Sequence, residues 1–344
     1  MKTQYANAVT QYENGTSLGG RIIKEGGLVV FPTETVYGLG ANGLNSEAVL
    51  RIFAAKGRPA DNPLILHIAK KSELKPLWSH VPDNARILAD TFWPGPLTMI
   101  FNRSSIVPDE VTAGLYKVAV RMPLNKTARA LINAAGVPIA APSANLSGKP
   151  SPTTAEHVRQ DMDGRVDLII DGGPCKYGLE STVVSLIGRP TILRPGAVTK
   201  EMLEAVIGPV DVAHAVLSPL REGETAASPG MKYRHYAPDA EVVVAEGKER
   251  EIAAKICREY DAREAAGEDC IIFATKQTQP FYRGRNCVII GDRTEPATLC
   301  ASLFYSLREY GDRADVIFAE ALPNDDMGLA YMNRLLRSAG FNII

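Results

Sequence analysis

The sequence predicts a mixed α/β (α+β) protein, with a twisted mixed sheet and helices in a first domain and a smaller Rossmann-like α/β domain after it. The chain has 344 residues, which exceeds the usual size of one domain. Strand patterns dominate the first two thirds, whereas strands and helices alternate after residue 240. We therefore expect a first domain at 1–207, a linker at 208–239 and a second domain at 240–344.

Short apolar runs predict the strands of the first domain. The expected strands are 28–31, 64–68, 97–101, 118–121, 138–141, 167–170, 182–186 and 191–194. One helix should begin with Ser46 as its N-cap and end near Lys56. Another, at about 83–92, should stop at Trp93-Pro-Gly-Pro96 because proline cannot continue a helix. So many strands with few helices between them favour a mixed sheet over strict βαβ alternation.

Residues 208–238 are rich in proline and glycine and lack a clear apolar period. A connection longer than about 15 residues is usually disordered or functional, so we expect this one to act as a lid. After it, we predict strands at 241–245, 270–274, 286–290 and 314–319, and helices at 248–266, 296–310 and 327–339. No GxGxxG motif occurs, so this architecture does not indicate dinucleotide binding.

Composition excludes several classes of protein. The formal net charge of −1 provides no global field for tight binding of a polyanion. The five cysteines are scattered, with no CxxC pair, which argues against a zinc site and fits reduced thiols. No run is long enough to span a membrane, and the first residues lack the pattern of a signal peptide. We therefore expect a cytoplasmic protein that does not associate with membranes.

Charged and hydroxyl side chains gather in loops at the ends of predicted strands, where sites tend to be built. The loop Phe31-Pro-Thr-Glu-Thr-Val-Tyr-Gly-Leu-Gly40 combines hydroxyls, a carboxylate and a phenol, which is more than a structural turn needs. Lys56 and Arg58 follow a helix end, where the dipole alone already favours cations. Arg121 lies in an apolar strand, so it must be paired or must reach a ligand.

Further hydrogen-bonding groups, neutral in two cases and cationic in the third, occupy three more strand ends. The segment 140–151 contains Ser143, Asn145 and Ser151, Ser181 begins a strand, and Arg194 ends another. Cations and hydroxyls without a nucleophile–base–acid triad fit catalysis by positioning and charge stabilisation, as phosphoryl or nucleotidyl transfer requires. The usual P-loop pattern is absent, so an ATP site here would be of another kind.

These motifs, in this order, resemble those of the YrdC-type L-threonylcarbamoyladenylate synthases in their two-domain form. The resemblance covers about residues 15–207 and 228–238, and the second domain matches more loosely. The motifs that carry it are Phe31-Pro-Thr-Glu-Thr-Val-Tyr-Gly-Leu-Gly40, Lys56-x-Arg58, Ser143-x-Asn145, Glu180-Ser-Thr-Val-Val184, Leu193-Arg-Pro-Gly196 and Ser228-Pro-Gly-Met-Lys-Tyr-Arg-His-Tyr-Ala-Pro238.

The resemblance implies a nucleotidyltransferase that joins L-threonine, bicarbonate and ATP into threonylcarbamoyl-AMP and pyrophosphate. Mg²⁺ would accompany ATP. The adenylate would pass to a separate tRNA threonylcarbamoyl transferase complex, which forms N6-threonylcarbamoyladenosine at position 37 of tRNAs reading ANN codons. A weak direct contact with tRNA stays open.

The resemblance also assigns residues to the two substrates, with Lys56 and Arg58 as the catalytic cations. Threonine or its carbamate would contact Thr35, His67, Arg121, Ser181 and, through its backbone, Ala141. ATP would contact Lys56, Arg58, Asn62, Ser143, Asn145, Ser151, Arg194 and Tyr236. The chain departs from the family at Lys117, where a threonine is common, and we include Lys117 among the ATP ligands.

Three other readings remain. The chain could be an RNA-binding module, although its net charge argues against tight binding. It could be a regulatory nucleotide-binding protein with a decayed site, although the cations and hydroxyls are intact. A carbamoyl-transferring maturation factor with a similar domain would carry paired CxxC zinc motifs and an acylphosphatase-like segment, and the sequence has neither.

Overall fold

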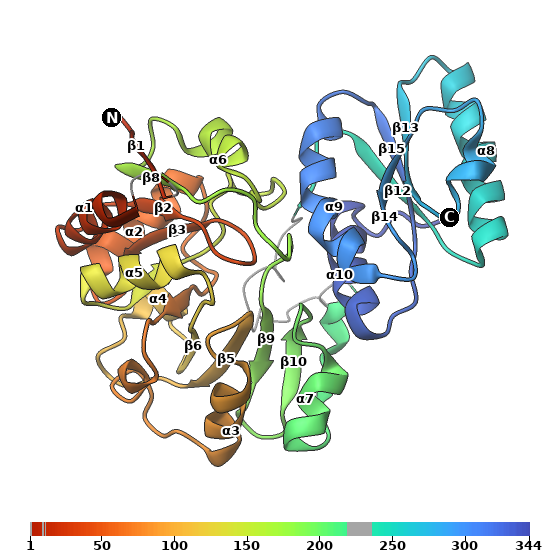
Figure 1. Ribbon diagram of the computed structural model, residues 1–344. Coiled ribbons are helices and arrows are strands. Elements are labelled where there is room, and N and C mark those ends of the chain that lie inside the picture. The colour runs from red at the N-terminus through yellow and green to blue at the C-terminus, as the bar shows by residue number, and fades with distance from the viewer. Residues whose placement is uncertain (1, 9, 11, 219–235) are drawn as a thin grey trace. The chain divides into compact units, whose positions relative to one another are not determined.

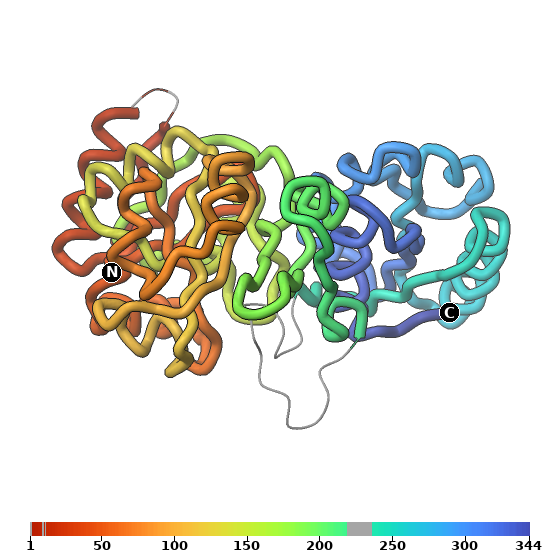
Figure 2. The backbone as a smooth tube through the Cα atoms, turned by 90° about the horizontal axis from the view of Figure 1, so that it is seen from below, coloured from red at the N-terminus to blue at the C-terminus, as the bar shows by residue number. Residues whose placement is uncertain are grey.

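The computed structural model describes residues 2–8, 10, 12–218 and 236–344 (Figure 2). Within these residues the chain forms two compact units, one of residues 2–147 and 151–216 and the other of residues 148–150, 217–218 and 236–344. Most of the predicted lid, residues 219–235, lies outside the described part of the chain. None of the helices described is both long and apolar enough to cross a membrane.

The first unit is built on an eleven-stranded mixed sheet with the order β1-β8-β2-β3-β7-β4-β6-β5-β9-β10-β11. Its strands are β1 (Gln4–Asn7), β2 (Val29–Phe31), β3 (Gly38–Asn42), β4 (Ile65–His67), β5 (Leu97–Asn102), β6 (Lys117–Arg121), β7 (Ile139–Ala141), β8 (Leu168–Asp171), β9 (Thr182–Ser185), β10 (Thr191–Arg194) and β11 (Asp211–Val212). Every strand that we predicted in this unit is confirmed, and β1, β3 and β11 are additional.

Helices cover both faces of this sheet. They are α1 (Tyr12–Lys24), α2 (Ser46–Lys56), α3 (Asp83–Phe92), α4 (Asp109–Thr112), α5 (Lys126–Ala135), α6 (Ala155–Met162) and α7 (Lys200–Ile207), with 3-10 turns η1 (Lys71–Leu74) and η2 (His214–Val216). One apolar cluster joins β2 and β8 to α1 and α5, and a second joins the sheet to α2, α3, α6 and α7. Successive residues of β2 alternate between the two clusters, as the pleat of a strand requires.

The expectation of few helices is wrong, and α1 shows why. Glycines within its sequence look like loop residues, but Gly20 lies where an added Cβ would stand 2.6 Å from the backbone of Ala134 on α5. These glycines let α1 and α5 approach closely, side by side in Figure 1. The predicted cap is also corrected: Asn45, rather than Ser46, accepts the hydrogen bond from the Ala48 N–H.

The second unit is a Rossmann-like parallel sheet with the order β12-β15-β13-β14. Its elements are β12 (Glu241–Ala245), α8 (Glu249–Ala265), β13 (Cys270–Thr275), η3 (Gln279–Tyr282), β14 (Cys287–Gly291), α9 (Pro296–Gly311), β15 (Val316–Glu320) and α10 (Asp326–Ser338). Figure 1 shows α8 on one face of the sheet, with α9 and α10 on the other. The predicted alternation after residue 240 is confirmed.

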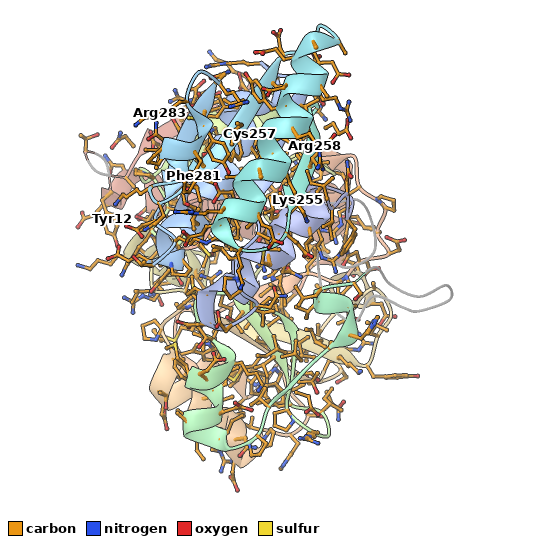
Figure 3. The ribbon with its side chains drawn as sticks, turned by 90° about the vertical axis from the view of Figure 1, so that its right-hand side faces the viewer. Tyr12, Lys255, Cys257, Arg258, Phe281 and Arg283 are labelled. Carbon is orange, nitrogen blue, oxygen red and sulfur yellow. The ribbon has the colours of Figure 1, made fainter. Side chains whose placement is uncertain are left out.

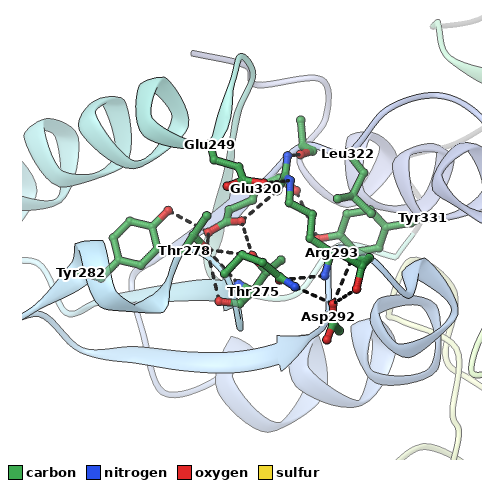
Figure 4. A network of polar contacts seen from close by, with 12 residues as sticks. Glu249, Thr275, Thr278, Tyr282, Asp292, Arg293, Glu320, Leu322 and Tyr331 are labelled. Carbon is green, nitrogen blue, oxygen red and sulfur yellow. Dashed lines mark hydrogen bonds and ion pairs between the residues drawn. The ribbon is translucent and has the colours of Figure 1, made fainter.

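Polar contacts join the elements of the second unit. The buried carboxylate of Glu320 accepts hydrogen bonds from Thr275, Thr278 and Tyr282 and pairs with Arg293 at 3.0 Å (Figure 4). On the α8 face, the Cys257 thiol donates to the carbonyl oxygen of Phe281, and the two residues lie near each other in Figure 3. The carboxyl ends of β13 and β15 are therefore held together by a satisfied buried carboxylate.

Candidate active site

The loop between β2 and β3 meets the end of β6 through a buried ion pair. Arg121 donates from Nη2 to Oε1 of Glu34 at 2.5 Å, from Nη1 to Oγ1 of Thr35 at 2.9 Å, and from Nε to the carbonyl oxygen of Gly95 at 3.3 Å. The side chains of Arg121 and Glu34 are 4% and 5% exposed. Of the two alternatives expected for an arginine in an apolar strand, a partner or a ligand, the structure shows a partner, Glu34.

This ion pair sets the charge of its neighbours. Burial alone would raise the pKa of Glu34, but the adjacent guanidinium of Arg121 holds that pKa below its ordinary value. His67, on β4, is the register partner of Arg121 on the adjacent parallel strand. Burial, with a further contribution from the charge of Arg121, lowers the pKa of His67 to about 3. At neutral pH the site therefore holds a charged pair beside a neutral imidazole.

The glycines of the loop are required by close packing. Gly38 and Gly40 belong to β3, and neither has a positive φ. A Cβ on Gly40 would stand 2.7 Å from Ile139 and 2.8 Å from the ring of Phe31. The ring of Phe31 in turn lies edge-on to His67, with 6.1 Å between their centroids. The glycines therefore let an aromatic ring fill the space beneath the loop.

Lys56 fixes the segment that follows β7. Its ammonium donates to the carbonyl oxygens of Ser143 and Asn145 at 2.5 and 2.6 Å, and its own carbonyl accepts from the N–H of Ser147 at 3.0 Å. Its side chain is buried, and Oγ of Ser143 donates to Oδ1 of Asn145 at 2.5 Å. Three residues that we predicted as ATP ligands are thus joined across some 90 residues of sequence, and Lys56 acts on the backbone of the loop.

Arg58 and Asn62 form the next loop. Arg58 donates to the carbonyl oxygen of Asn62 at 3.1 Å, and its guanidinium lies 5.7 Å from the centre of the Phe53 ring. The side chain of Asn62 is fully buried, and neither its oxygen nor its nitrogen has a hydrogen-bond partner among the residues that the structure describes. A buried amide without partners is costly, which suits a residue that gains its hydrogen bonds from a ligand.

A second group of hydroxyls surrounds the start of β9. Arg194 donates from Nε to the carbonyl oxygen of Ser181 at 3.0 Å and from Nη2 to its hydroxyl at 3.2 Å. That hydroxyl also lies 2.8 Å from Oγ1 of Thr98. Ser151 is buried and donates to Oε1 of Glu180 at 2.6 Å. The structure therefore brings Ser181, predicted to contact threonine, into direct contact with Arg194, predicted to contact ATP.

Comparison with known proteins identifies the family. Residues 21–196 match the Sua5/YciO/YrdC family model, described as "Telomere recombination", and residues 198–340 match the model described as "Threonylcarbamoyl-AMP synthase, C-terminal domain". The chain is 47% identical over 326 residues to the threonylcarbamoyl-AMP synthase of Bacillus subtilis, covering 94% of this chain and 92% of that protein. The chain belongs to the Sua5/YciO/YrdC family of threonylcarbamoyl-AMP synthases.

Further relatives agree with this assignment. The threonylcarbamoyl-AMP synthase of Pyrococcus abyssi is 47% identical over 325 residues, covering 94% of this chain and 93% of that one. The crystal structure of P. abyssi Sua5 complexed with L-threonine matches with a TM-score of 0.93 and 44% identity, covering 100% of this chain and 99% of that chain. The chain is an enzyme of the nucleotidyltransferase type, as the relatives named threonylcarbamoyl-AMP synthase indicate.

The three remaining residues predicted for this synthase site lie on β7, on β6 and in the second unit. Ala141 ends β7 and pairs with Ile65 on β4, whereas His67 pairs with Ile139 at the start of β7. Lys117 is exposed at the opposite end of β6 from Arg121, about 13 Å away along the strand. Tyr236 lies in the second unit, where it is buried with φ of 64° and its ring stacks 4.9 Å from that of Phe304.

Four residues of the synthase site were missed as contributors. Glu34 and Glu180 are buried carboxylates that hold Arg121 and Ser151, and Thr33 and Thr98 support Thr35 and Ser181 through their hydroxyls. Glu34 and Glu180 lie inside two of the motifs that carry the family resemblance, so the sequence already contained an indication of their role. A buried carboxylate next to predicted ligands is itself an indication that a cation must lie nearby.

Proposed function

We propose that the chain forms L-threonylcarbamoyl-AMP and pyrophosphate from L-threonine, bicarbonate and ATP. The product would supply N6-threonylcarbamoyladenosine formation at position 37 of tRNAs reading ANN codons, through a separate transferase complex. The relatives named threonylcarbamoyl-AMP synthase and the threonine-bound relative support the reaction class. Bicarbonate and the tRNA step follow from the chemistry of the product. Its carbamoyl group needs a carbon source, and the threonylcarbamoyl group needs an acceptor once it is made.

The observation that carries the proposal is two groups of cations in the first unit, grouped by the substrate that each would hold: Arg121 ends β6, while Arg58 follows α2 and Arg194 ends β10. Arg121 lies beside Thr35 and the neutral His67, where it would receive the carboxylate of threonine by bidentate hydrogen bonding. Because burial keeps His67 uncharged, it would add no positive charge that competes with Arg121. The amino group of threonine must be unprotonated to attack the carbon of bicarbonate-derived CO₂, and the positive charge of Arg121 nearby would favour that form.

The second cation group would serve ATP. Carbamate oxygen attacks the α-phosphorus, the bond to the β-phosphate oxygen breaks, and pyrophosphate leaves with the bonding electrons. Negative charge must be held throughout, which Arg58 and Arg194 would do as planar donors, with the loop set by Lys56 positioning Ser143 and Asn145. In this proposal Lys56 acts chiefly by fixing the loop, since its ammonium already holds two carbonyls.

We further propose that Mg²⁺ binds with ATP. Among the described residues, no group of three or more histidine, cysteine, aspartate or glutamate side chains is placed to hold a metal ion. That fits an ion held chiefly by phosphate oxygens and water, as Mg²⁺ usually is at nucleotide sites. When bound, it would neutralise phosphate charge.

Pyrophosphate release from ATP and bicarbonate, with and without L-threonine, tests the reaction. Wild type should require threonine, and Arg58→Ala should lose at least about 100-fold in rate, as expected for one phosphate-stabilising group. Arg86→Ala is the matched control, because Arg86 is exposed on α3. Turnover that does not need threonine would refute the proposal and favour a regulatory nucleotide-binding protein.

A further inference from the structure

The guanidinium of Arg121 is already neutralised by a carboxylate of the chain itself. Of its five N–H groups, three donate to Glu34, Thr35 and Gly95, and the remaining two have no partner among the described residues. The carboxylate of a bound amino acid would therefore be the second carboxylate at one buried guanidinium. Two like charges at one site repel each other, and burial strengthens that repulsion.

Glu34 is anchored so that it cannot easily move aside. Its Oε2 accepts the backbone N–H of Asn125, the N-cap of α5, at 3.1 Å, while Oε1 binds Arg121. Its backbone carbonyl accepts the N–H of Tyr177 at 2.9 Å. The carboxylate thus has fixed partners on both oxygens, and a ligand would have to share Arg121 with it rather than replace it.

We propose that Glu34 is a built-in counter-ion that competes with the amino-acid carboxylate for Arg121 and so sets a moderate affinity for threonine. This inference rests on the proposed function, in which Arg121 receives that carboxylate. Without a ligand, Glu34 compensates a buried charge that would otherwise be costly. With a ligand, it prevents threonine and the product, which keeps the same carboxylate, from binding so tightly that release becomes slow.

The charge of Glu34 can be separated from its geometry. Glu34→Gln keeps an oxygen that can accept from Nη2 of Arg121 but removes the negative charge. If Glu34 only orients Arg121, Glu34→Gln should bind threonine more weakly than wild type or equally well. A competing counter-ion gives the opposite sign, because Arg121 is then left with its full charge for the ligand.

Calorimetric titration of the full chain with L-threonine and with L-threoninamide, which lacks the carboxylate, tests this. Glu34→Gln should bind L-threonine at least about tenfold more tightly than wild type, while its affinity for L-threoninamide changes by less than about twofold. In turnover, KM for threonine and kcat should both fall, since product release slows. Glu110→Gln, a half-buried glutamate that accepts a hydrogen bond from Ser46, is the control and should change neither.

Two results separate this inference from the proposed function. If wild type does not distinguish L-threonine from L-threoninamide, the carboxylate does not bind Arg121 and the proposed assignment fails. If wild type distinguishes them but Glu34→Gln binds threonine no more tightly, the counter-ion role is overturned. Should that variant not fold, Glu34→Asp retracts the charge by one methylene and should tighten threonine binding about twofold to fivefold; unchanged or weaker binding overturns the inference equally.

Discussion

Replacing Lys56 with methionine should loosen the loop that follows β7. The variant keeps the length and apolar stem of the side chain but removes the ammonium that donates to the carbonyl oxygens of Ser143 and Asn145. Lys56 is only 3% exposed, so water cannot easily take over these hydrogen bonds. The prediction is a loss both of stability in the first unit and of ATP affinity.

The magnitude follows from the two bonds. Each hydrogen bond from a charged donor contributes about 1.5–3 kcal/mol, so the gross loss is about 3–6 kcal/mol. Removing a buried charge recovers part of its desolvation cost, which leaves a net loss of about 2–4 kcal/mol in unfolding free energy. If ATP must then order the loop at a cost of about 2–3 kcal/mol, its affinity should fall about 30- to 150-fold.

Tryptophan fluorescence gives a clean assay of this loss. The chain has two tryptophans, Trp78 and Trp93, and both are buried in the first unit. Urea unfolding followed at these residues therefore reports on that unit alone, and calorimetry with a non-hydrolysable ATP analogue gives the affinity. Lys24→Met, at an exposed lysine of α1, is the matched control and should stay within about 0.5 kcal/mol of wild type.

The reasoning would be refuted by a Lys56→Met protein with unchanged urea midpoint and slope and intact ATP binding. Lower ATP affinity with no loss of stability would also count against a loop-fixing role, because it would make Lys56 a direct ligand of the nucleotide instead. Loss of stability without loss of affinity would show that the loop does not contribute to the ATP site.

Three further predictions concern other parts of the molecule. Gly196→Ala should abolish pyrophosphate release and cost about 1–3 kcal/mol in urea unfolding, because its Cβ would stand 2.9 Å or less from the backbone at and beside Ser181. The pKa of His67 falls from 6.5 to about 3 on folding, so its contribution to the free energy of unfolding is fully present above pH 6.5 and is lost progressively as the pH falls towards 3. Between pH 7 and pH 5, the free energy of unfolding should therefore fall by about 2 kcal/mol less in His67→Asn than in wild type, as measured by urea unfolding at each pH. Glu320→Gln leaves Arg293 buried beside a neutral amide and should speed hydrogen exchange in β13 and β15, while tryptophan-detected unfolding of the first unit stays unchanged.

The sequence predicted those strands and helices whose residue pattern depends on their own burial. Apolar runs identified β2, the strands from β4 to β10 and the alternation of the second unit, because burial on a pleated sheet imposes that pattern directly. The segment of α5 carries equally local signals, with Asn125 as N-cap and Gly136 in a left-handed conformation with φ of 65° after its end, and it could have been found. The glycines of α1 make room for neighbours that are distant in sequence, on α5, β8 and the β1 strand, so sequence alone could not explain them.

The site shows the same division between local and distant information. An arginine in an apolar strand indicated that Arg121 needs a partner, but Glu34 lies 87 residues away and only the fold brings the two together. Likewise, the contact of Lys56 with Asn145 spans 89 residues. The chemical kinds of group could therefore be predicted from the loops, whereas the partner of each group depends on sheet order, which is set by the packing of the whole unit.

The strand order of the first unit has a consequence for synthesis on the ribosome. Among the described strands β1 pairs only with β8, so residues 4–7 lack a partner until residues 168–171 are made. β5 pairs with β6 on one side, but its other edge lacks a partner until residues 182–185 of β9 are made. A nascent chain shorter than about 170 residues exposes unpaired strand edges, which are templates for aggregation. The second unit forms its whole sheet from residues 241–320, so it can fold soon after it emerges. Early translation of the first unit is thus the period in which this enzyme most needs protection by chaperones.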